Sequence, residues 1–216
     1  MVGQGVLLEC LDEADVKRVV SVVRRPTGVT HAKLTEIVHA DFFDYAAIEP
    51  SLRDADACFF CLGVSSVGMK EADYRHVTYD LTMAAANTLH RLNPDLAFIY
   101  VSGAGTDSTE TGKSMWARVK GKTENDLAKL FARAYAFRPG YIHPVKGVRS
   151  RTAWVNVAIT VLRPVGFLLK QFPGAGTSSD VLGRAMIAAV RSGAPTHAVE
   201  SREINTLGAA APPNAG

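Results

Sequence analysis

Two cysteines three positions apart, Cys58 and Cys61, have the spacing of a redox-active pair. A C-x-x-C pair can cycle between dithiol and disulfide when both sulfur atoms lie together at the start of a helix. Here the surrounding residues are apolar (Ala57-Cys58-Phe59-Phe60-Cys61-Leu62), which is typical of a buried strand. Because residues three apart on a strand point to opposite faces, we expect these thiols to be structural.

The composition excludes several other classes of function. The 216 residues have a net charge of +3, and their basic residues are dispersed apart from Arg24-Arg25 and Arg149-Ser150-Arg151. A mild charge without a basic patch argues against a nucleic-acid partner. The three cysteines are too few for a secreted disulfide scaffold, and the six histidines show no metal-ligand spacing. The amino terminus has no basic segment typical of a secretory signal, so a cytoplasmic protein is expected.

Apolar runs alternate with helical periodicity along most of the chain. Strands are predicted at Arg18–Val23, Leu34–Ala40, Ala57–Leu62, Ala97–Val101 and Tyr135–Arg138. Helices are predicted at residues 2–12, 77–92, 119–130, 152–172 and 180–189. The alternation predicts an α/β fold, a doubly wound, Rossmann-like parallel sheet whose strands are buried on both faces. We expect one domain over residues 1–206, with a substrate-side region at about 141–206 and a flexible tail at 207–216.

The first strand of such a sheet is missing from the sequence. A doubly wound sheet normally begins with an apolar strand that leads through a glycine-rich turn into the first helix. This sequence instead begins with Met1-Val2-Gly3-Gln4-Gly5 and enters a helix at once. Losing about five buried apolar side chains would cost roughly 7–15 kcal/mol, as much as a whole domain's stability. We therefore expect either a start site about ten residues too far downstream or a gap beside the strands Arg18–Val23 and Ala57–Leu62.

Five short motifs occur in an order that is shared with a known family. They are Phe59-Phe60-Cys61-Leu62-Gly63, Val77-Thr78-Tyr79-Asp80, Tyr100-Val101-Ser102-Gly103, Val119-Lys120-Gly121-Lys122-Thr123-Glu124 and Phe137-Arg138-Pro139-Gly140. This order resembles the atypical, extended-type short-chain dehydrogenase/reductases. That NAD(P)-binding branch includes Tat-interacting-protein-like oxidoreductases and bacterial epimerase-like proteins. The resemblance implies an NAD(P)-binding site at the carboxyl ends of the strands.

The resemblance also assigns residues to the cofactor. Gly3 would be the last glycine of the phosphate loop, although Gly3 and Gly5 could also be ordinary flexible residues. Arg24 and Arg25, after the second strand of the family's sheet, would favour the 2′-phosphate of NADP over NAD, unless they are simply a solvated pair. The remaining cofactor candidates, which could also serve only as turn or strand-end residues, are Asp41, Phe42, Leu62, Gly63, Pro139 and Gly140.

The family's catalytic residues are only partly present. Short-chain reductases use a Tyr-x-x-x-Lys pair on one helix face together with a serine, and the lysine holds the cofactor ribose and lowers the tyrosine pKa. Lys120 matches the lysine, but Trp116 stands at the tyrosine position, and an indole cannot act as an acid or base. Ser102 is the candidate serine, or else a strand-end cap, with Thr106 and Ser108 as substitutes.

These departures leave several hypotheses open. The first is an NADP-dependent oxidoreductase or epimerase-like protein of weak or nonstandard activity, acting on a small molecule held by residues 64–69, 103–108 and the segment after Gly140. The second is a non-catalytic module that senses the cofactor or binds a partner. A third hypothesis is that residues 152–172 contact a membrane surface. The alternative is that this segment packs against the core. Related proteins form homodimers through the helices at 77–92 and 119–130.

Overall fold

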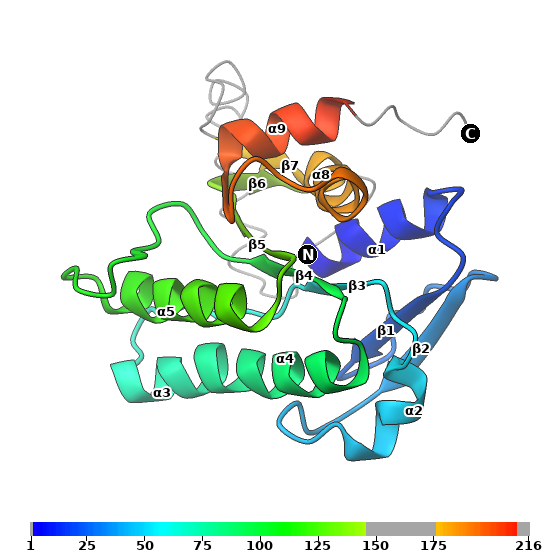
Figure 1. The fold of residues 1–216 in the computed structure, drawn as a ribbon, viewed down its shortest axis with the longest axis horizontal. Helices are drawn as coiled ribbons and strands as arrows, with labels where there is room; N and C mark the ends of the chain where they lie inside the picture. Colours follow the sequence, from blue (N-terminus) through cyan, green and yellow to red (C-terminus); the bar gives the residue numbers. More distant parts are fainter. Residues whose placement is uncertain (1, 146–175, 211–216) are drawn as a thin grey trace.

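The computed structural model describes residues 2–145 and 176–210, and its strands form parallel pairs (Figure 1). One sheet has the order β3-β4-β5-β8, and β1 pairs with β2 in a second sheet. The bounds are β1 Val19–Val23, β2 Leu34–Val38, β3 Ala57–Phe60, β4 Ala97–Val101, β5 Ala134–Arg138 and β8 Ala198–Glu200. Two short strands, β6 (Tyr141–His143) and β7 (Gly176–Ser178), pair with each other beyond β5.

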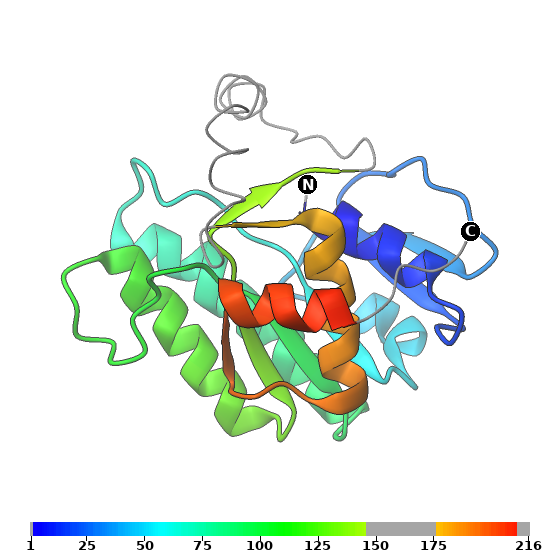
Figure 2. The same cartoon turned by 90° about the horizontal axis from the view of Figure 1, so that it is seen from above.

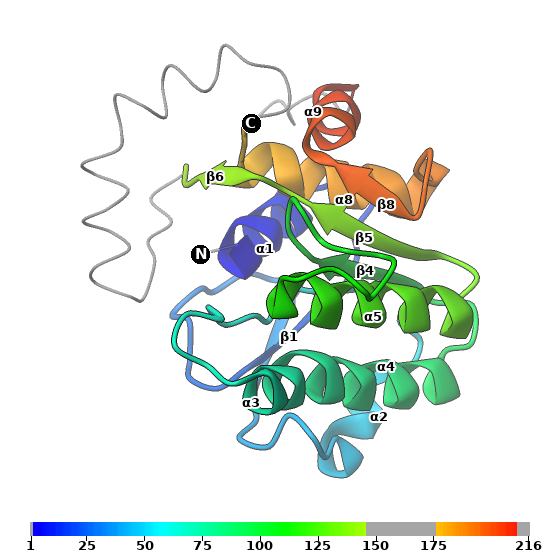
Figure 3. The ribbon, with the colours of Figure 1, turned by 90° about the vertical axis from the view of Figure 1, so that its left-hand side faces the viewer.

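Helices cover both faces of the sheet, as Figure 3 shows in side view. One face is covered by α3 (Glu71–Arg75), the π-helical turn η2 (His76–Asp80), α4 (Leu81–Leu92) and α5 (Met115–Leu130). The other face is covered by α1 (Val2–Asp12), α8 (Ser179–Ser192) and α9 (Ser201–Ala210), and α8 lies between α1 and α9 (Figure 2). The short η1 (Ala46–Ile48) and α2 (Glu49–Leu52) precede β3. The predicted doubly wound α/β fold is confirmed.

The period-two alternation of β4 explains how the two helical layers are held. Phe98 and Tyr100 point into the cluster that contains α4 and α5 residues, and Ile99 points into the cluster that contains α1, α8 and α9 residues. These three side chains are at most 1% exposed. Each face of the strand therefore has its own core, and β4 joins the two.

A gap in the sheet, one of the two alternatives predicted, is present between β1 and β3. β1 and β3 belong to different sheets, and no ladder joins them. The prediction that the first of these strands is buried on both faces is wrong, because all five residues Val19–Val23 are partly exposed. A strand that pairs on one edge only keeps its other edge, and part of each face, open to water.

Some element boundaries differ from the predictions. The helix predicted from residue 77 begins at Glu71 as α3 and continues through η2 into α4. The strand β8 and the helix α9 were not predicted, and α9 runs to Ala210, so residues 207–210 are helical instead of a loose tail. The predicted segment 152–172 lies outside the described residues. Within the described ranges, no helix combines the length and apolar character needed to cross a bilayer.

Candidate functional site

The loops that follow β3, β4 and β5 meet at one edge of the four-stranded sheet, which we call the carboxyl edge. The Ser102 amide donates to the Phe137 carbonyl at 2.8 Å, and the Ala104 amide donates to the Pro139 carbonyl at 3.1 Å. Gly140 is held by the first residue of α9, because its amide donates to the Ser201 hydroxyl at 2.8 Å. Parallel strands necessarily end on the same side, and this brings together the predicted candidates Leu62, Gly63, Ser102, Pro139 and Gly140.

Lys120 reaches this edge from α5. Its amine donates to the Val101 carbonyl and to the Tyr100 hydroxyl, each at 3.3 Å, and lies 5.0 Å from the centre of the Tyr100 ring. Burial lowers the pKa of Lys120 to about 8. The nearby carboxylate of Glu124 acts in the opposite direction and raises this pKa, but by less. The structure therefore places the predicted lysine beside the carboxyl end of β4, next to Ser102.

The hydroxyl of Ser102 belongs to a local network. Ser102 is buried, and its oxygen lies 3.0 Å from the hydroxyl oxygen of Thr106, which in turn donates to the Gly103 carbonyl at 2.8 Å. The Ser108 hydroxyl is instead taken by the guanidinium of Arg138. Of the two substitutes considered for Ser102, Thr106 is therefore the one that shares its surroundings.

Trp116 lies one helical turn before Lys120, and its indole packs near the loop after β4. A methyl group on Gly105 would come within 3.7 Å of the Trp116 ring. The helix is held close to this loop, because the Asp107 amide donates to the Ala117 carbonyl at 3.1 Å. A Cβ at Gly121 would lie only 1.8 Å from the Asp107 carbonyl oxygen, so glycine is required there.

Tyr100 is the tyrosine that the structure places beside Lys120, and sequence reasoning did not single it out. It is 1% exposed, and burial raises its pKa far above the ordinary value. A phenol held neutral in this way is a poor acid or base near neutral pH. The alternation in the run Ala97–Val101 could have placed Tyr100 on the α5 side, but not against one particular lysine.

A buried ion pair behind the carboxyl edge was also missed. The guanidinium of Arg138 binds the carboxylate of Glu124 on α5, with its Nε 3.1 Å from Oε1, and its Nη1 lies 3.2 Å from Oε1 of Glu200. Arg138 and Glu124 are both buried. This pair fixes α5 against the end of β5, immediately before Pro139.

The other predicted cofactor residues, Gly3, Arg24, Arg25 and Asp41, lie on α1 and after the strands β1 and β2, whereas Lys120 lies on α5. Gly3, in the first turn of α1, is close to the end of β3, since a Cβ on it would be 3.2 Å from that of Cys61. Arg24 and Arg25 follow β1, are exposed, and form no hydrogen bond or ion pair with the described residues. The Asp41 carboxylate accepts the Phe43 amide at 2.9 Å and so forms a turn.

Phe42 is buried, and its ring contributes to the core. Its ring centre lies 6.3 Å from that of Tyr45 and 5.9 Å from that of His39. The side chain therefore packs inward beneath the turn after β2, while the neighbouring Asp41 is exposed.

The two cysteines are placed as predicted. Cys58 packs against the α4–α5 side and Cys61 against the α1–α8 side of the sheet. Both are free thiols, and burial raises the pKa of each to about 12. The prediction of structural, unpaired thiols on opposite faces is confirmed, because a thiol that stays protonated is unreactive.

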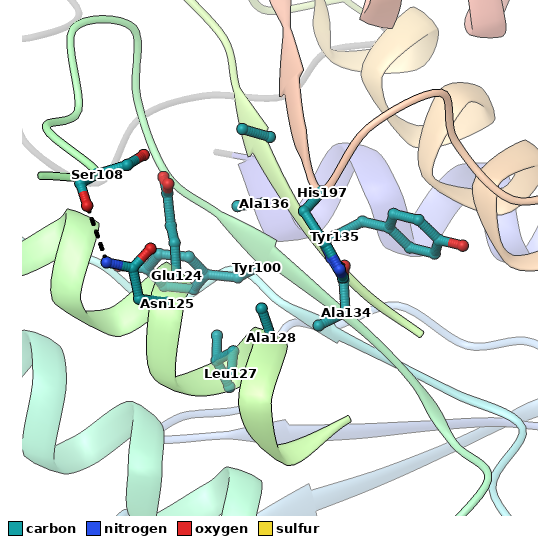
Figure 4. Close-up of a pocket in the computed structure, with 11 residues that line it drawn as sticks. Tyr100, Ser108, Glu124, Asn125, Leu127, Ala128, Ala134, Tyr135, Ala136 and His197 are labelled. Atoms are coloured by element: carbon teal, nitrogen blue, oxygen red, sulfur yellow. Dashed lines mark hydrogen bonds between the residues drawn. The ribbon is translucent and has the colours of Figure 1, made fainter. Parts of the chain in front are cut away.

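A cavity of about 170 Å³ lies between α5 and the strands β5 and β8 (Figure 4). Its polar lining includes Glu124 and Asn125, and the Asn125 amide donates to the Ser108 carbonyl at 2.9 Å. Neither Lys120 nor Ser102 lines it. Of the predicted catalytic candidates, only Ser108, a substitute considered for Ser102, lines the cavity, and Trp116 does not.

No protein-family model matches the sequence, and no curated protein matches it significantly. Solved structures do share its fold. An oxidoreductase of the short-chain dehydrogenase/reductase family from Burkholderia thailandensis is 16% identical with a TM-score of 0.65, covering 91% of this chain and 84% of that one. The Bordetella bronchiseptica enzyme WbmF in complex with NAD+ is 16% identical with a TM-score of 0.63, and the match covers 95% of this chain and 73% of that one.

A third solved structure is the UDP-glucose 4-epimerase of Thermus thermophilus in complex with NAD. It is 15% identical with a TM-score of 0.63, covering 98% of this chain and 80% of that one. At these identities the comparisons show the fold. The Rossmann-like fold that the motif order implied is therefore confirmed by both the architecture and its structural neighbours.

Proposed function

We propose that this protein binds a nicotinamide dinucleotide along the carboxyl edge and acts as a short-chain-reductase-like oxidoreductase of nonstandard chemistry. The observation that carries this proposal is the position of Lys120. Its amine reaches from α5 to the carbonyl of Val101, the last residue of β4, and the next residue along the chain, Ser102, has its buried hydroxyl 3.0 Å from that of Thr106. A cation at the end of a central strand, with hydroxyl groups beside it, suits a ribose and an adjacent carbonyl group.

The residues present fit such a cofactor at both of its ends. A Cβ on Gly63 or Gly103 would meet no atom within 4 Å, so the space above the ends of β3 and β4 is open. The first turn of α1 presents unpaired backbone N–H groups beside Gly3, which suits a pyrophosphate. When bound, the nicotinamide would supply hydride transfer. Lys120 would hold its ribose, and Gly63 would let the chain pass close to it.

NADP is the form that we favour over NAD. Arg24 and Arg25 are exposed at the carboxyl end of β1 and have no acidic partner in the described residues. A guanidinium binds a phosphate through two parallel hydrogen bonds, whereas the free 2′-hydroxyl of NAD is usually met by a carboxylate. The neighbours whose structures hold a cofactor hold NAD, so this preference is a property proposed for the present chain.

The small-molecule substrate would lie between the loops at 64–69 and 103–108. Val64 and Val67 are 49% and 86% exposed in the first of these loops. Isolated apolar side chains at the rim of a site can contact the apolar part of a substrate. Such a substrate would bring its carbonyl group to the Lys120 end of the edge.

A second candidate function, cofactor binding without turnover, is favoured by one observation. Trp116 occupies the position one turn before Lys120, and the tyrosine that contacts Lys120 is deeply buried with a raised pKa. Neither side chain can exchange a proton readily with a carbonyl oxygen. A protein with this arrangement could sense the cofactor without reducing a substrate.

Cofactor titration tests the binding proposal. We expect the purified chain to bind NADPH at least about tenfold more tightly than NADH. The double variant Arg24→Ala, Arg25→Ala should lose that preference, and Lys120→Met should weaken both cofactors. The matched control is Lys129→Met, because Lys129 lies on the same helix but is 74% exposed. Absence of NADPH and NADH binding in the unmodified chain would contradict the proposal.

Restoring the missing phenol separates the two candidate functions. With NADPH and a panel of carbonyl compounds, Trp116→Tyr should raise turnover by about 10²-fold, since a positioned acid contributes roughly that much. Trp116→Phe is the control, because it changes the ring without adding a hydroxyl group. If NADPH binds but neither the unmodified chain nor Trp116→Tyr turns over any substrate, the binding module is the better description.

A further inference from the structure

Helix α5 carries three lysines, and two of them share one carboxylate. The amines of Lys122 and Lys129 each lie 2.8 Å from an oxygen of Asp126, and their side chains are 32% and 74% exposed. Lys120 differs, because no acidic side chain within residues 2–145 and 176–210 forms an ion pair with it. Lys120 is therefore the lysine of this helix whose charge no carboxylate compensates directly.

Both contacts of the Lys120 amine are with neutral oxygen atoms. The amine donates to the Val101 carbonyl and to the Tyr100 hydroxyl, each at 3.3 Å. A charged ammonium carries three N–H donors, whereas a neutral amine carries two and keeps a lone pair. These two acceptors satisfy every donor of the neutral amine, and they leave its lone pair free to act as a nucleophile.

The carboxylate one turn further along α5 is already engaged. Both oxygens of Glu124 accept from Nε of Arg138, at 3.1 and 3.2 Å, and a guanidinium stays charged, so this buried pair has no net charge. Tyr100 contacts Lys120, and Tyr74 of α3 interacts with Tyr100; burial raises the pKa of both phenols, so both are neutral. Burial lowers the pKa of Lys120 to about 8, so about half of its amines are neutral at pH 8.

Lys120 also lies where a small compound can reach it. The residue is partly exposed, and Val101, which its amine contacts, is the last residue of β4 at the carboxyl edge. Two residues further along the chain, a Cβ at Gly103 would meet no atom within 4 Å. Trp116, four residues before Lys120, lies on the same face of α5 and offers an apolar ring. The partial exposure and the open space give a small compound access to the amine.

We propose that Lys120 forms a Schiff base with small aldehydes at the carboxyl edge, an activity that needs no bound dinucleotide. The lone pair of the neutral amine attacks the carbonyl carbon, and one amine proton passes to the carbonyl oxygen. The carbon–oxygen bond then breaks, the oxygen leaves as water with the second amine proton, and a C=N bond remains. Aldehydes suit the site better than ketones, because a partly buried nitrogen favours the less hindered carbonyl group.

Reductive trapping on the full chain tests this proposal. The purified protein, without nucleotide, is incubated at pH 7.5 with dilute propanal and sodium cyanoborohydride, which reduces an imine to a stable propyl-lysine. Mass spectrometry of peptides then gives the rate at each lysine. Lys122 and Lys129 are the internal comparators, because the amines of both are held in ion pairs with Asp126. We expect Lys120 to react at least about tenfold faster than either, since more of it is neutral.

Two controls show whether the folded structure causes the difference. In concentrated urea the excess at Lys120 should disappear, because unfolding removes the burial that keeps its amine neutral. In Lys120→Arg the fast reaction should be absent, while Lys122 and Lys129 react as before. The proposal is overturned if Lys120 in the native chain reacts no faster than Lys129, or if its excess persists in urea. Both results are independent of nucleotide binding, so they leave the cofactor proposal to its own titration.

Discussion

Strands β4 and β1 are both mainly apolar runs of five residues, but they differ in burial. β4 is Ala-Phe-Ile-Tyr-Val, with β3 and β5 on its two edges, and its first four residues are buried. β1 is Val-Val-Ser-Val-Val, with β2 on one edge only, and none of its residues is fully buried. An apolar run thus shows that a segment can be buried, whereas neighbours on both edges decide whether it is.

The difference extends to the two halves of the molecule. In the four-stranded half, α5 is held by a buried ion pair and by the close approach of Gly121 to the Asp107 loop. In the two-stranded half, the corresponding polar contact is between Glu36 and Thr27, at a partly buried position. We therefore expect substitutions of similar chemistry to have larger effects in the four-stranded half.

The largest expected effect comes from shortening a core side chain in β4. Phe98→Ala should lower the free energy of unfolding by about 3–5 kcal/mol, because Phe98 is fully buried and its loss leaves a cavity. Val22→Ala in β1 should cost only about 1 kcal/mol, since that side chain is partly exposed. Urea denaturation followed by circular dichroism measures both. Equal losses would show that the two strands are packed alike.

Removing one carboxylate in each half gives the next largest contrast. Glu124→Ala leaves the buried guanidinium of Arg138 without its main partner and should cost about 3 kcal/mol at pH 7. Glu36→Ala removes acceptors for the Thr27 amide and hydroxyl groups and should cost about 1 kcal/mol. The same denaturation experiment compares them. A larger loss for Glu36→Ala would reverse the ranking of the two halves.

The smallest effect concerns the buried cation of the four-stranded half and depends on pH. Because burial lowers the pKa of Lys120 to about 8 from 10.5, the unfolded chain binds more protons between those values. The penalty that this charge imposes on folding is therefore complete below pH 8 and disappears as the pH rises to 10.5. Lys120→Met should stabilise the protein by about 1–2 kcal/mol at pH 7, and by much less above about pH 10.

Thermal unfolding at pH 7 and pH 10.5 measures this change. The control is Lys129→Met on the exposed side of α5, which should change the stability by less than about 0.5 kcal/mol at either pH. A gain for Lys120→Met that persists at pH 10.5 would mean that methionine packs better, independently of charge.

Most of the architecture was predictable from local pattern. The runs at 34–38, 97–101 and 134–138 are strands close to where the hydrophobic pattern predicted them. Helix α1 begins at Val2, where the predicted helix begins. The short strand β8 was not predicted, because three residues carry too little periodicity to identify a strand. The start of α3 was missed for a related reason, since a polar first turn has no apolar repeat.

The candidate site was predictable only in outline. Lys120 and Ser102 were found through the order of motifs, and the structure places them at one edge. The motif order did not predict that Lys120 contacts Tyr100 or that Glu124 pairs with Arg138. Each of these contacts depends on how α5 packs on the sheet. Such contacts join residues 14 to 20 positions apart through packing. Sequence spacing alone does not encode them.

The sequence by itself determined the element types, the placement of Cys58 and Cys61 on opposite faces, and the gap beside the strands at 18–23 and 57–62. These properties follow from side-chain periodicity and backbone sterics, which act between near neighbours along the chain. Only the tertiary structure decided that β1 stays partly exposed and that Tyr100 contacts Lys120. Burial and strand pairing depend on segments that are brought together from distant positions in the chain. The desolvation that lowers the pKa of Lys120 depends on the same packing.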